Sequence, residues 1–442
     1  MRPARLPLAV LCCTLLALAG VAVVVGAPPP TSLCGVCGPG VVDDSEIDGS
    51  TGPGTLDIYV DETGDSLWSA RVPVTDSTAD RYGANETALE SAVDDAWVTP
   101  HAAGGDVRTV ASTVDDGAVV VNYTVNDVAR PGVGDAWLVD YFADVASNTR
   151  YSVTAERVTI HAPDGTVVTN DPAHASVDGN TATWTRDDGS ASGGDFSRQT
   201  YVTYGEDSVR GAASGYATIG LERGPPALER GVLGGLLPGT LLVLAGVAVG
   251  RYDPGRETLS PATLERLFVA VGTLGAVGLL ALSVAATGRP LSPGLGALSA
   301  LGIGYASIGI AARRSTYRHT TRGLAGIAGL VTLGTGVLLW IFGGAVAVIA
   351  LPFALATACF LPLGRVSTNR SKPAFAALFA VLPALALIAG AVSLAFLVSP
   401  AGLGVILYWL LLAFWGVLIV AFGYPLGLMG RRLAEAETPA EP

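Results

Sequence analysis

Cys34 and Cys37 are the residues of this chain whose types and spacing come closest to a chemical motif. A Cys-x-x-Cys pair can cycle between dithiol and disulfide, supply two ligands to a metal ion, or close a short structural disulfide. A zinc site normally has four ligands, and the sequence contains no second pair at this spacing. No helical pattern follows Cys37, as a thioredoxin-like redox motif would require. We therefore expect a local disulfide or two free thiols, and no metal.

Other groups of polar residues are weaker candidates for a site. The segment Asp44–Gly49 resembles the start of a calcium-binding loop, but its twelfth position holds Thr55 instead of the required Glu. His101, His161 and His174 lack the spacing of metal ligands, and His161 is expected to be a hydrogen-bonded structural side chain beside a turn. The sequence also has no nucleophile turn and no Gly-rich phosphate loop. We expect no catalytic, cofactor-binding or metal-binding residues, no cofactor, and no enzyme.

Charge is distributed unevenly along the 442 residues. Residues 28–230 contain 32 acidic residues, 24 of them Asp, and 11 Arg, which gives a net charge of −21. Residues 231–442 carry a net charge of +7. An acidic surface of this size repels phosphate, so the composition argues against a nucleic-acid partner.

An apolar run from Leu6 to Ala27 follows two arginines at the N-terminus. This is the layout of an export signal, and a run of 22 residues is also long enough to cross a bilayer core of about 30 Å. Residues 1–27 are therefore expected to be a signal peptide or a signal anchor, and either one places the following segment outside the cell. Residues 28–54, rich in Pro, Gly and acidic residues, are typical of a linker.

Residues 55–229 have the pattern of a β-rich domain, because runs of β-branched and aromatic residues alternate with polar residues and end at turn residues. One amphipathic helix is expected near Asn85–Trp97, where apolar residues recur at helical spacing and Thr87–Glu90 fits a capping box. We expect a sandwich-like domain with this helix packed on it. The predicted strands are 55–60, 66–72, 107–113, 118–125, 136–142, 151–161, 181–185 and 200–204.

Seven apolar runs follow within residues 230–430, and each is long enough to cross a bilayer. The fourth and fifth form one tract of 42 residues, which as a single helix would be about 63 Å long, so we expect a turn at Gly343-Gly344. Gly246-x-x-x-Gly250 and Gly423-x-x-x-Gly427 are spacings that permit close helix contacts. The expected fold is a membrane α-helical bundle with a tail at 431–442. Its expected spans are 231–250, 267–287, 291–312, 323–342, 345–364, 373–398 and 403–429.

Positive charges in the loops between these spans predict the orientation. Alternate loops, with the tail, carry 12 Lys and Arg on one side of the membrane, and the remaining loops carry one. The β-rich domain is therefore expected to be extracellular and the C-terminus cytoplasmic, in a multi-pass protein of the cell membrane. In this orientation the sequons at Asn85 and Asn122 are possible N-glycosylation sites, whereas the sequon at Asn369 lies inside.

Three short segments carry a resemblance to known proteins: Gly64–Trp68, Val158–Gly165 and Thr181–Trp184. With the order of an exported β-rich domain before a multi-helix membrane region, and with a composition rich in Asp and nearly free of Lys, the chain resembles uncharacterised haloarchaeal membrane proteins. The resemblance covers roughly Thr55–Tyr204. It implies no activity, so no functional residue is carried over from it.

The seven apolar runs contain no Asp, Glu, Lys, Arg or His, which ion and proton pathways normally need. The leading hypothesis is a cell-surface protein whose outer domain binds or senses an extracellular ligand, an envelope protein or a signalling partner. The alternative is a transporter or permease component for an apolar or neutral solute, because Pro352, Pro362, Pro383 and Pro425 can break helices at a substrate site. A polar cavity within the bundle would favour this alternative, and a tightly packed bundle would favour the leading hypothesis.

Overall fold

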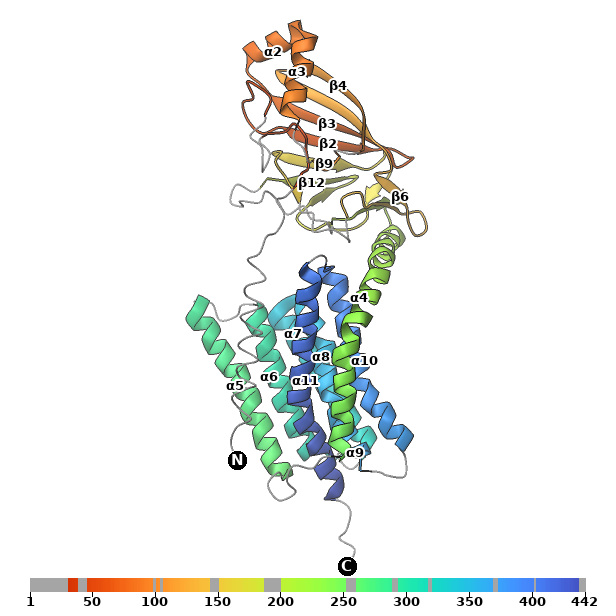
Figure 1. The fold of residues 1–442 in the computed structure, drawn as a ribbon, viewed down its shortest axis with the longest axis vertical. Coiled ribbons are helices and arrows are strands. Elements are labelled where there is room, and N and C mark those ends of the chain that lie inside the picture. Colours follow the sequence, from red (N-terminus) through yellow and green to blue (C-terminus); the bar gives the residue numbers. More distant parts are fainter. Residues whose placement is uncertain are drawn as a thin grey trace, which may run out of the picture. The chain divides into compact units, whose positions relative to one another are not determined.

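The computed structural model describes residues 31–38, 46–97, 101–103, 106–143, 151–186, 200–251, 260–287, 293–316, 320–368, 373–400 and 403–436. These residues divide into two compact units, the first ending at Gly224 and the second beginning at Pro225 (Figure 1). The first unit is rich in β-strands and the second is helical, which confirms the general layout expected from the sequence. The expected signal or anchor at 1–27 lies outside the described residues.

The first unit is built on a seven-stranded sheet with the strand order β11-β12-β9-β2-β3-β5-β4. Its strands are antiparallel except for β2 and β9, which pair in parallel, with Thr55 opposite Arg157. Side chains alternate between core and solvent, as in β2, where Leu56, Ile58 and Val60 are buried. The strands are β2 (Thr55–Val60), β3 (Ser66–Pro73), β4 (Val107–Asp115), β5 (Ala118–Val125), β9 (Arg157–His161), β11 (Ser176–Asp178) and β12 (Thr181–Thr185).

Two smaller groups of strands complete this unit. A four-stranded sheet has the order β10-β13-β7-β6, and its buried residues Val139, Val168 and Tyr204 belong to the same core as the large sheet. The strands of this sheet are β6 (Ala129–Pro131), β7 (Trp137–Val139), β10 (Val167–Val168) and β13 (Val202–Gly205). The last two strands, β1 (Thr31–Ser32) and β8 (Tyr151–Ser152), pair in parallel.

Two short helices, α2 (Asp76–Ala84) and α3 (Glu86–Ala96), follow β3 and contribute Tyr82, Leu89 and Val93 to the core. The sequence predicts only the second of them. The expected capping box at Thr87–Glu90 is wrong, because the N-cap of α3 is Asn85, two residues before Thr87. The side chain of Asn85 accepts a hydrogen bond from the Ala88 amide at 3.2 Å.

The segment predicted as a linker contributes several residues to the core. Leu33, Val36 and Ile47 are fully or almost fully buried, as are the two cysteines between them. The Gly54 amide donates to the Cys37 carbonyl at 2.7 Å, which ties this segment to the start of the large sheet. The β-rich unit therefore includes residues from 31 onward, because these apolar side chains need a core that a solvated linker would not offer.

The second unit consists of long apolar helices (Figure 1). The first of them, α4, begins at Val209, which still belongs to the first unit and lies 22 residues before the expected first span, and three prolines lie within it. The helices are α4 (Val209–Arg251), α5 (Pro261–Thr287), α6 (Pro293–Arg314), α7 (Thr321–Ala347), α8 (Leu351–Ala358), α9 (Phe360–Val366), α10 (Pro373–Val398) and α11 (Leu403–Glu435), with the short 3-10 helix η2 (Val348–Ala350) between α7 and α8.

Six helical segments among the described residues are long and apolar enough to cross a membrane. The 42-residue tract is interrupted at Gly344, whose φ of 71° is left-handed, and the turn falls where the sequence predicts it. Helix α5 is not one of the six, so the expected count of seven spans stays a prediction. The six segments are 209–249, 294–314, 321–344, 348–366, 379–398 and 404–435.

Glycines bring several of these helices into close contact. Gly364 of α9 lies directly against the backbone of Gly427 in α11, and Gly423 packs on the ring of Phe360. In the neighbouring pair, a Cβ atom at Gly302 of α6 would lie 2.7 Å from the carbonyl oxygen of Gly272 in α5. At these crossings a side chain would push the helices apart, as is usual for small residues at helix interfaces in membranes.

Candidate functional site

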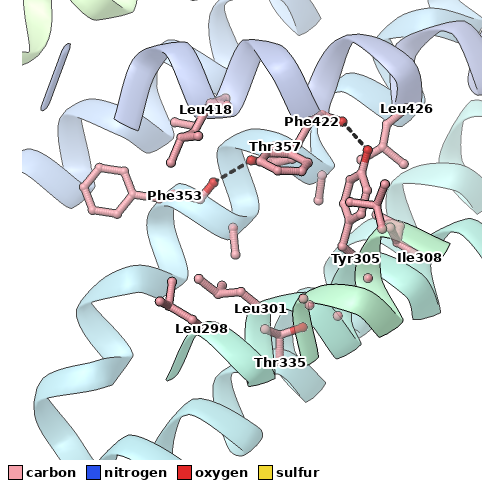
Figure 2. Close-up of a pocket in the computed structure, with 18 of the residues that line it drawn as sticks. Leu298, Leu301, Tyr305, Ile308, Thr335, Phe353, Thr357, Leu418, Phe422 and Leu426 are labelled. Carbon is pink, nitrogen blue, oxygen red and sulfur yellow. Dashed lines mark hydrogen bonds between the residues drawn. The ribbon is translucent and has the colours of Figure 1, made fainter. Parts of the chain in front are cut away.

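A cavity of about 560 Å³ lies within the helical unit (Figure 2). This volume is within the range of about 300–1,000 Å³ that is typical of small-molecule sites. The cavity is lined from five helices, α5, α6, α7, α8 and α11, mainly by leucine, isoleucine, glycine and aromatic side chains. Residues at its two sides include Leu298 and Leu301 of α6 and Leu418 and Leu426 of α11.

The hydroxyl groups around the cavity already have partners. Tyr305 of α6 donates a hydrogen bond to the carbonyl of Phe422 in α11 at 2.9 Å (Figure 2). Thr332, Thr335 and Thr357 each donate to the carbonyl four residues earlier in their own helix, at 2.7–3.1 Å. The lining residues include no Asp, Glu, Lys, Arg or His. The site is therefore suited to an apolar molecule, and it offers no ion pair within the cavity.

Aromatic rings form two walls of the cavity. Phe353 of α8 and Trp415 of α11 are stacked with their centroids 4.9 Å apart. On the other side, Tyr305 makes edge-to-face contacts with Phe422 at 5.2 Å and with Phe268 at 5.3 Å. Rings that are fixed by such contacts make a wall of defined shape.

Glycines on one face of α5 create the width of the cavity. Gly275 and Gly278 line it, and a Cβ atom added at either position would meet no atom closer than 3.9 Å. Leu274, which directly precedes Gly275 and also lines the cavity, is 75% exposed. The cavity therefore reaches the outer surface of the helical unit beside α5, where lipid would surround a protein embedded in a membrane.

A first group of charged residues lies at the ends of α5 and α6. The carboxylate of Glu265 forms an ion pair with Arg313, and a second one with Arg314 at 3.3 Å. The Glu265 side chain is only 7% exposed, whereas that of Arg314 is 76% exposed. The carboxylate is thus compensated, and one of the two cations faces outward.

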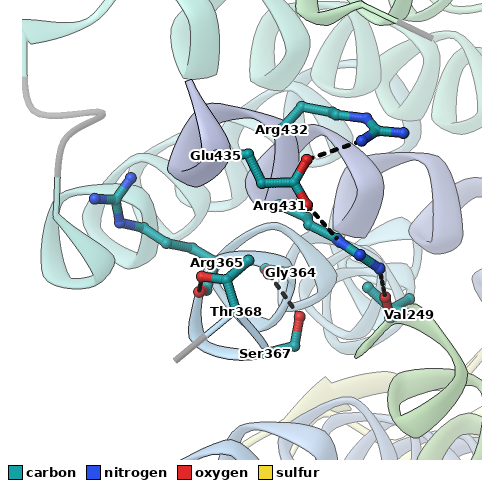
Figure 3. Close-up of polar contacts among 8 residues, drawn as sticks. All are labelled: Val249, Gly364, Arg365, Ser367, Thr368, Arg431, Arg432 and Glu435. Carbon is teal, nitrogen blue, oxygen red and sulfur yellow. Dashed lines mark hydrogen bonds and ion pairs between the residues drawn. The ribbon is translucent and has the colours of Figure 1, made fainter. Parts of the chain in front are cut away.

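A second group lies at the end of α11 (Figure 3). Glu435 pairs with Arg431 at 2.9 Å and with Arg432 at 2.8 Å. Arg431 also donates to the carbonyl of Val249 in α4 at 3.3 Å. The backbone of Arg365, near the end of α9, packs against Gly430 of α11. Like the first group, this one contains two arginines around one carboxylate.

Cys34 and Cys37 of the first unit form a disulfide bond. Both residues are almost completely buried, and the ring of His101 packs near Gly35 between them. Burial lowers the pKa of His101 to about 4, and neither ring nitrogen has a hydrogen-bond partner among the described residues. Among the described residues, no group of three or more His, Cys, Asp or Glu side chains is arranged to hold a metal ion. Asp44 and Ser45 of the calcium-like segment lie outside the described residues.

The other residues singled out from the sequence are dispersed over the first unit. His161 of β9 shares a hydrogen bond of 2.9 Å with Asp57 of β2, and its ring stacks on Tyr59 at 4.4 Å. His174 lies in a turn with a φ of 61°. Asn85 is exposed at the start of α3, and Asn122 is half-buried in β5. The fold does not bring these residues together into one site.

No protein-family model matches this sequence, and no curated protein matches it. The cavity is also a site that the sequence analysis missed. A signal for it was present in the glycines Gly272, Gly275 and Gly278 of α5 and in Gly302 and Gly304 of α6. Because some of these glycines close the helix contact and others open the cavity, their spacing alone does not separate the two roles.

Proposed function

We propose that this chain is a multi-pass membrane protein whose helical unit binds one long apolar chain in the cavity. The observation that carries the proposal is the cavity itself, with a volume of about 560 Å³ and hydroxyl groups that are already hydrogen-bonded. The helical unit is not tightly packed at this cavity, and the cavity is not the polar one that would favour a transporter, so the proposal is binding of an apolar molecule without transport. The cavity is not polar, so a polar solute is not supported.

Physical chemistry favours an occupied cavity. Apolar side chains that line an empty space lose van der Waals contacts on that side, so an apolar molecule that fills the cavity restores them. Water is a poor occupant because a buried water needs two to four polar partners. Hydrocarbon from the surrounding bilayer can enter beside Leu274, and it matches the lining.

The proposed location is the cell membrane, with the β-rich unit outside and the C-terminus inside. The number of arginines at the ends of the helices supports this orientation. We also propose α5 as the seventh span, because its 27 residues would extend about 40 Å and its contact with α6 at Gly272 is tight.

The test uses the fluorescence of Trp415, which lines the cavity. In the full chain, Trp340→Phe and Trp409→Phe would leave Trp415 as the one tryptophan of the helical unit. This protein is reconstituted in phosphatidylcholine vesicles whose acyl chains carry bromine, which quenches tryptophan on contact. We expect strong quenching of Trp415. At both Gly275 and Gly278 a Cβ atom would meet no atom closer than 3.9 Å, so the double variant Gly275→Leu/Gly278→Leu should occupy part of the cavity and remove at least half of that quenching.

A matched control separates the cavity from the general lipid around the helices. A second protein keeps Trp409, which is half-exposed, and has Trp340→Phe and Trp415→Phe. Bromine should quench Trp409 equally with and without the two leucines. If the leucines leave the quenching of Trp415 unchanged, no lipid chain occupies the cavity and the proposal fails.

A second candidate function is recognition of an envelope partner by the β-rich unit. Tyr59 lies opposite Leu67 of β3 and opposite His161 of β9, so three side chains form a row on the solvent face of the large sheet. Tyr59 is 46% exposed and Leu67 is 42% exposed, and exposed aromatic and apolar groups are typical of contact surfaces.

This second candidate can be tested in intact cells. A photo-crosslinking amino acid at Leu67 should give one discrete adduct, and the same amino acid at the exposed Glu90 of α3 should give none. Equal labelling at both positions would mean that the row of side chains has no partner.

A further inference from the structure

The cavity occupies the middle of the helices that line it. In α6 the lining residues lie within 298–308, so five residues of the helix precede them and six follow. In α5 they lie within 271–278, with ten residues before them and nine after. In α11 they lie within 415–426, with twelve residues before them and nine after. If these helices cross a bilayer, their middle parts lie near its midplane, and the cavity lies there too.

The length of the cavity can be compared with the thickness of a bilayer. The lining extends along α6 and α11 for about 15–17 Å, at about 1.5 Å per residue. The hydrocarbon core of a bilayer is about 30 Å thick, so about 7 Å of this core remains on each side of the cavity. A lipid whose head group stays at the membrane surface would therefore reach the cavity only with the end of its chain. A molecule without a head group could occupy the full length.

No charged group is available to bind a head group inside the cavity. Every charged residue of the lining helices lies at least five positions along its helix from the nearest lining residue. The closest are Arg266 in α5, Arg313 in α6 and Arg431 in α11, and five positions correspond to about 7–8 Å along a helix axis. The hydroxyl groups of the lining already donate to backbone carbonyls. A charged or zwitterionic head group would therefore be buried without an ion pair, which is strongly unfavourable.

The opening of the cavity lies at the same depth. Leu274 is the central residue of α5, it lines the cavity, and it is 75% exposed. Val277 beside it is 66% exposed, and a Cβ atom added at Gly278 would meet no atom within 4 Å. An opening in the middle of a membrane helix faces the midplane of the bilayer. The ends of lipid chains meet there, and hydrocarbons without a head group dissolve there.

We propose that the preferred occupant of the cavity is a chain-like hydrocarbon without a head group, which enters from the middle of the bilayer. This inference rests on the proposed function, which is that the helical unit binds one apolar chain, and it adds that this chain is not part of a membrane lipid. A free hydrocarbon can contact the lining along its full length. The end of a lipid chain would leave part of the lining without van der Waals contacts.

The experiment is a competition in the full chain with Trp415 as the one tryptophan of the helical unit. The protein is reconstituted in brominated phosphatidylcholine, whose chain ends enter the cavity when no better occupant is present. Tetradecane is then added at a small mole fraction. We expect tetradecane to remove at least half of the quenching that depends on Gly275 and Gly278, because it displaces the brominated chain from the cavity.

A matched compound tests the role of the head group. Tetradecanoic acid has a chain of the same length that ends in a carboxyl group, and this group is ionised at alkaline pH. At equal amounts in the bilayer, the acid should relieve the quenching of Trp415 several-fold less than tetradecane does. If the acid competes as well as tetradecane, the cavity accepts a charged head group and the inference is wrong.

Two control proteins separate the cavity from the surrounding lipid. Tetradecane should leave the quenching of Trp409 unchanged in the protein that keeps only this tryptophan in the helical unit. It should also leave unchanged the quenching of Trp415 that remains in Gly275→Leu/Gly278→Leu. Equal relief at Trp415 and Trp409 would mean that tetradecane only dilutes the bromine around the helices, and this result would overturn the inference.

The remaining outcomes distinguish the inference from the proposed function. If the two leucines reduce the quenching of Trp415 but tetradecane does not, the cavity holds the chain ends of membrane lipids. The inference then fails, and the proposed function stands. If the leucines leave the quenching of Trp415 unchanged in every mixture, no chain occupies the cavity, and both fail.

Discussion

At the scale of single residues, His101 is distinctive because it is 5% exposed and lies edge-on against Trp97. Neither of its ring nitrogens is hydrogen-bonded to another described residue. Such a side chain is stable only as the neutral imidazole. Its pKa of about 4 lies below the ordinary value of 6.5, so the unfolded chain binds a proton that the folded chain excludes. The contribution of His101 is therefore fully present above about pH 6.5 and is lost as the pH falls toward 4.

We predict that acidification from pH 7 to pH 4 removes about 3 kcal/mol of stability through this one residue. In His101→Phe, which keeps an aromatic ring at the position, the decrease in the free energy of unfolding over this interval should be smaller by that amount. Fluorescence of the buried Trp68 and Trp184 during denaturant unfolding provides the measurement. Parallel pH profiles of the two proteins would contradict the assignment.

The disulfide between Cys34 and Cys37 closes a very short loop, so its entropic contribution is modest. We predict that Cys34→Ala/Cys37→Ala lowers the free energy of unfolding by about 2 kcal/mol. Because both cysteines are buried, the native protein should resist reduction, and alkylation of these thiols should require unfolding. Rapid alkylation of the native protein in reductant would show that the disulfide is accessible.

At the scale of elements, the longer strands could be predicted and the shorter ones could not. The predicted run 118–125 coincides with β5, and 55–60 coincides with β2, because alternation over six to eight residues is a clear signal. Strands β1 and β10 have only two residues each, and no alternation can be recognised in so short a segment. The single predicted strand 151–161 is two strands in the structure, β8 (Tyr151–Ser152) and β9 (Arg157–His161). The cavity could not be predicted from the sequence either, because it depends on which glycines of α5 face α6.

Gly364 and Gly326 allow the role of helix contacts to be tested at this scale. A Cβ atom at Gly364 of α9 would overlap the backbone of Gly427, whereas one at Gly326 of α7 would meet no atom within 4 Å. We predict that Gly364→Ala costs about 1–3 kcal/mol, as overpacking does, and that Gly326→Ala is neutral or slightly stabilising. Thermal unfolding of both variants in detergent is the measurement. Equal midpoints would mean that α9 and α11 do not pack as described.

At the scale of the whole molecule, the two units differ in charge as strongly as in fold. The net charge of −21 over residues 28–230 opposes compaction of the β-rich unit, and salt must screen it. We predict that the segment 28–224 shows strand-type circular dichroism in molar salt and loses it in millimolar salt. The measurement is a salt titration, with a neutral osmolyte as the control for general stabilisation. A spectrum unchanged at low salt would argue against adaptation to high salt.

The parallel pairing of β2 with β9 sets an order of events during synthesis of the chain. The hairpin partner β3 emerges immediately after β2, but β9 lies about 100 residues further along the chain. At a synthesis rate of about 5–20 residues per second, one edge of β2 stays unpaired for roughly 5–20 s, until β9 has been synthesised. During this time the β2–β3–β5 meander presents an unpaired edge, to which another strand could add. The interval ends before α4 is made, so the sheet can close before the helices that would tether it to the membrane exist.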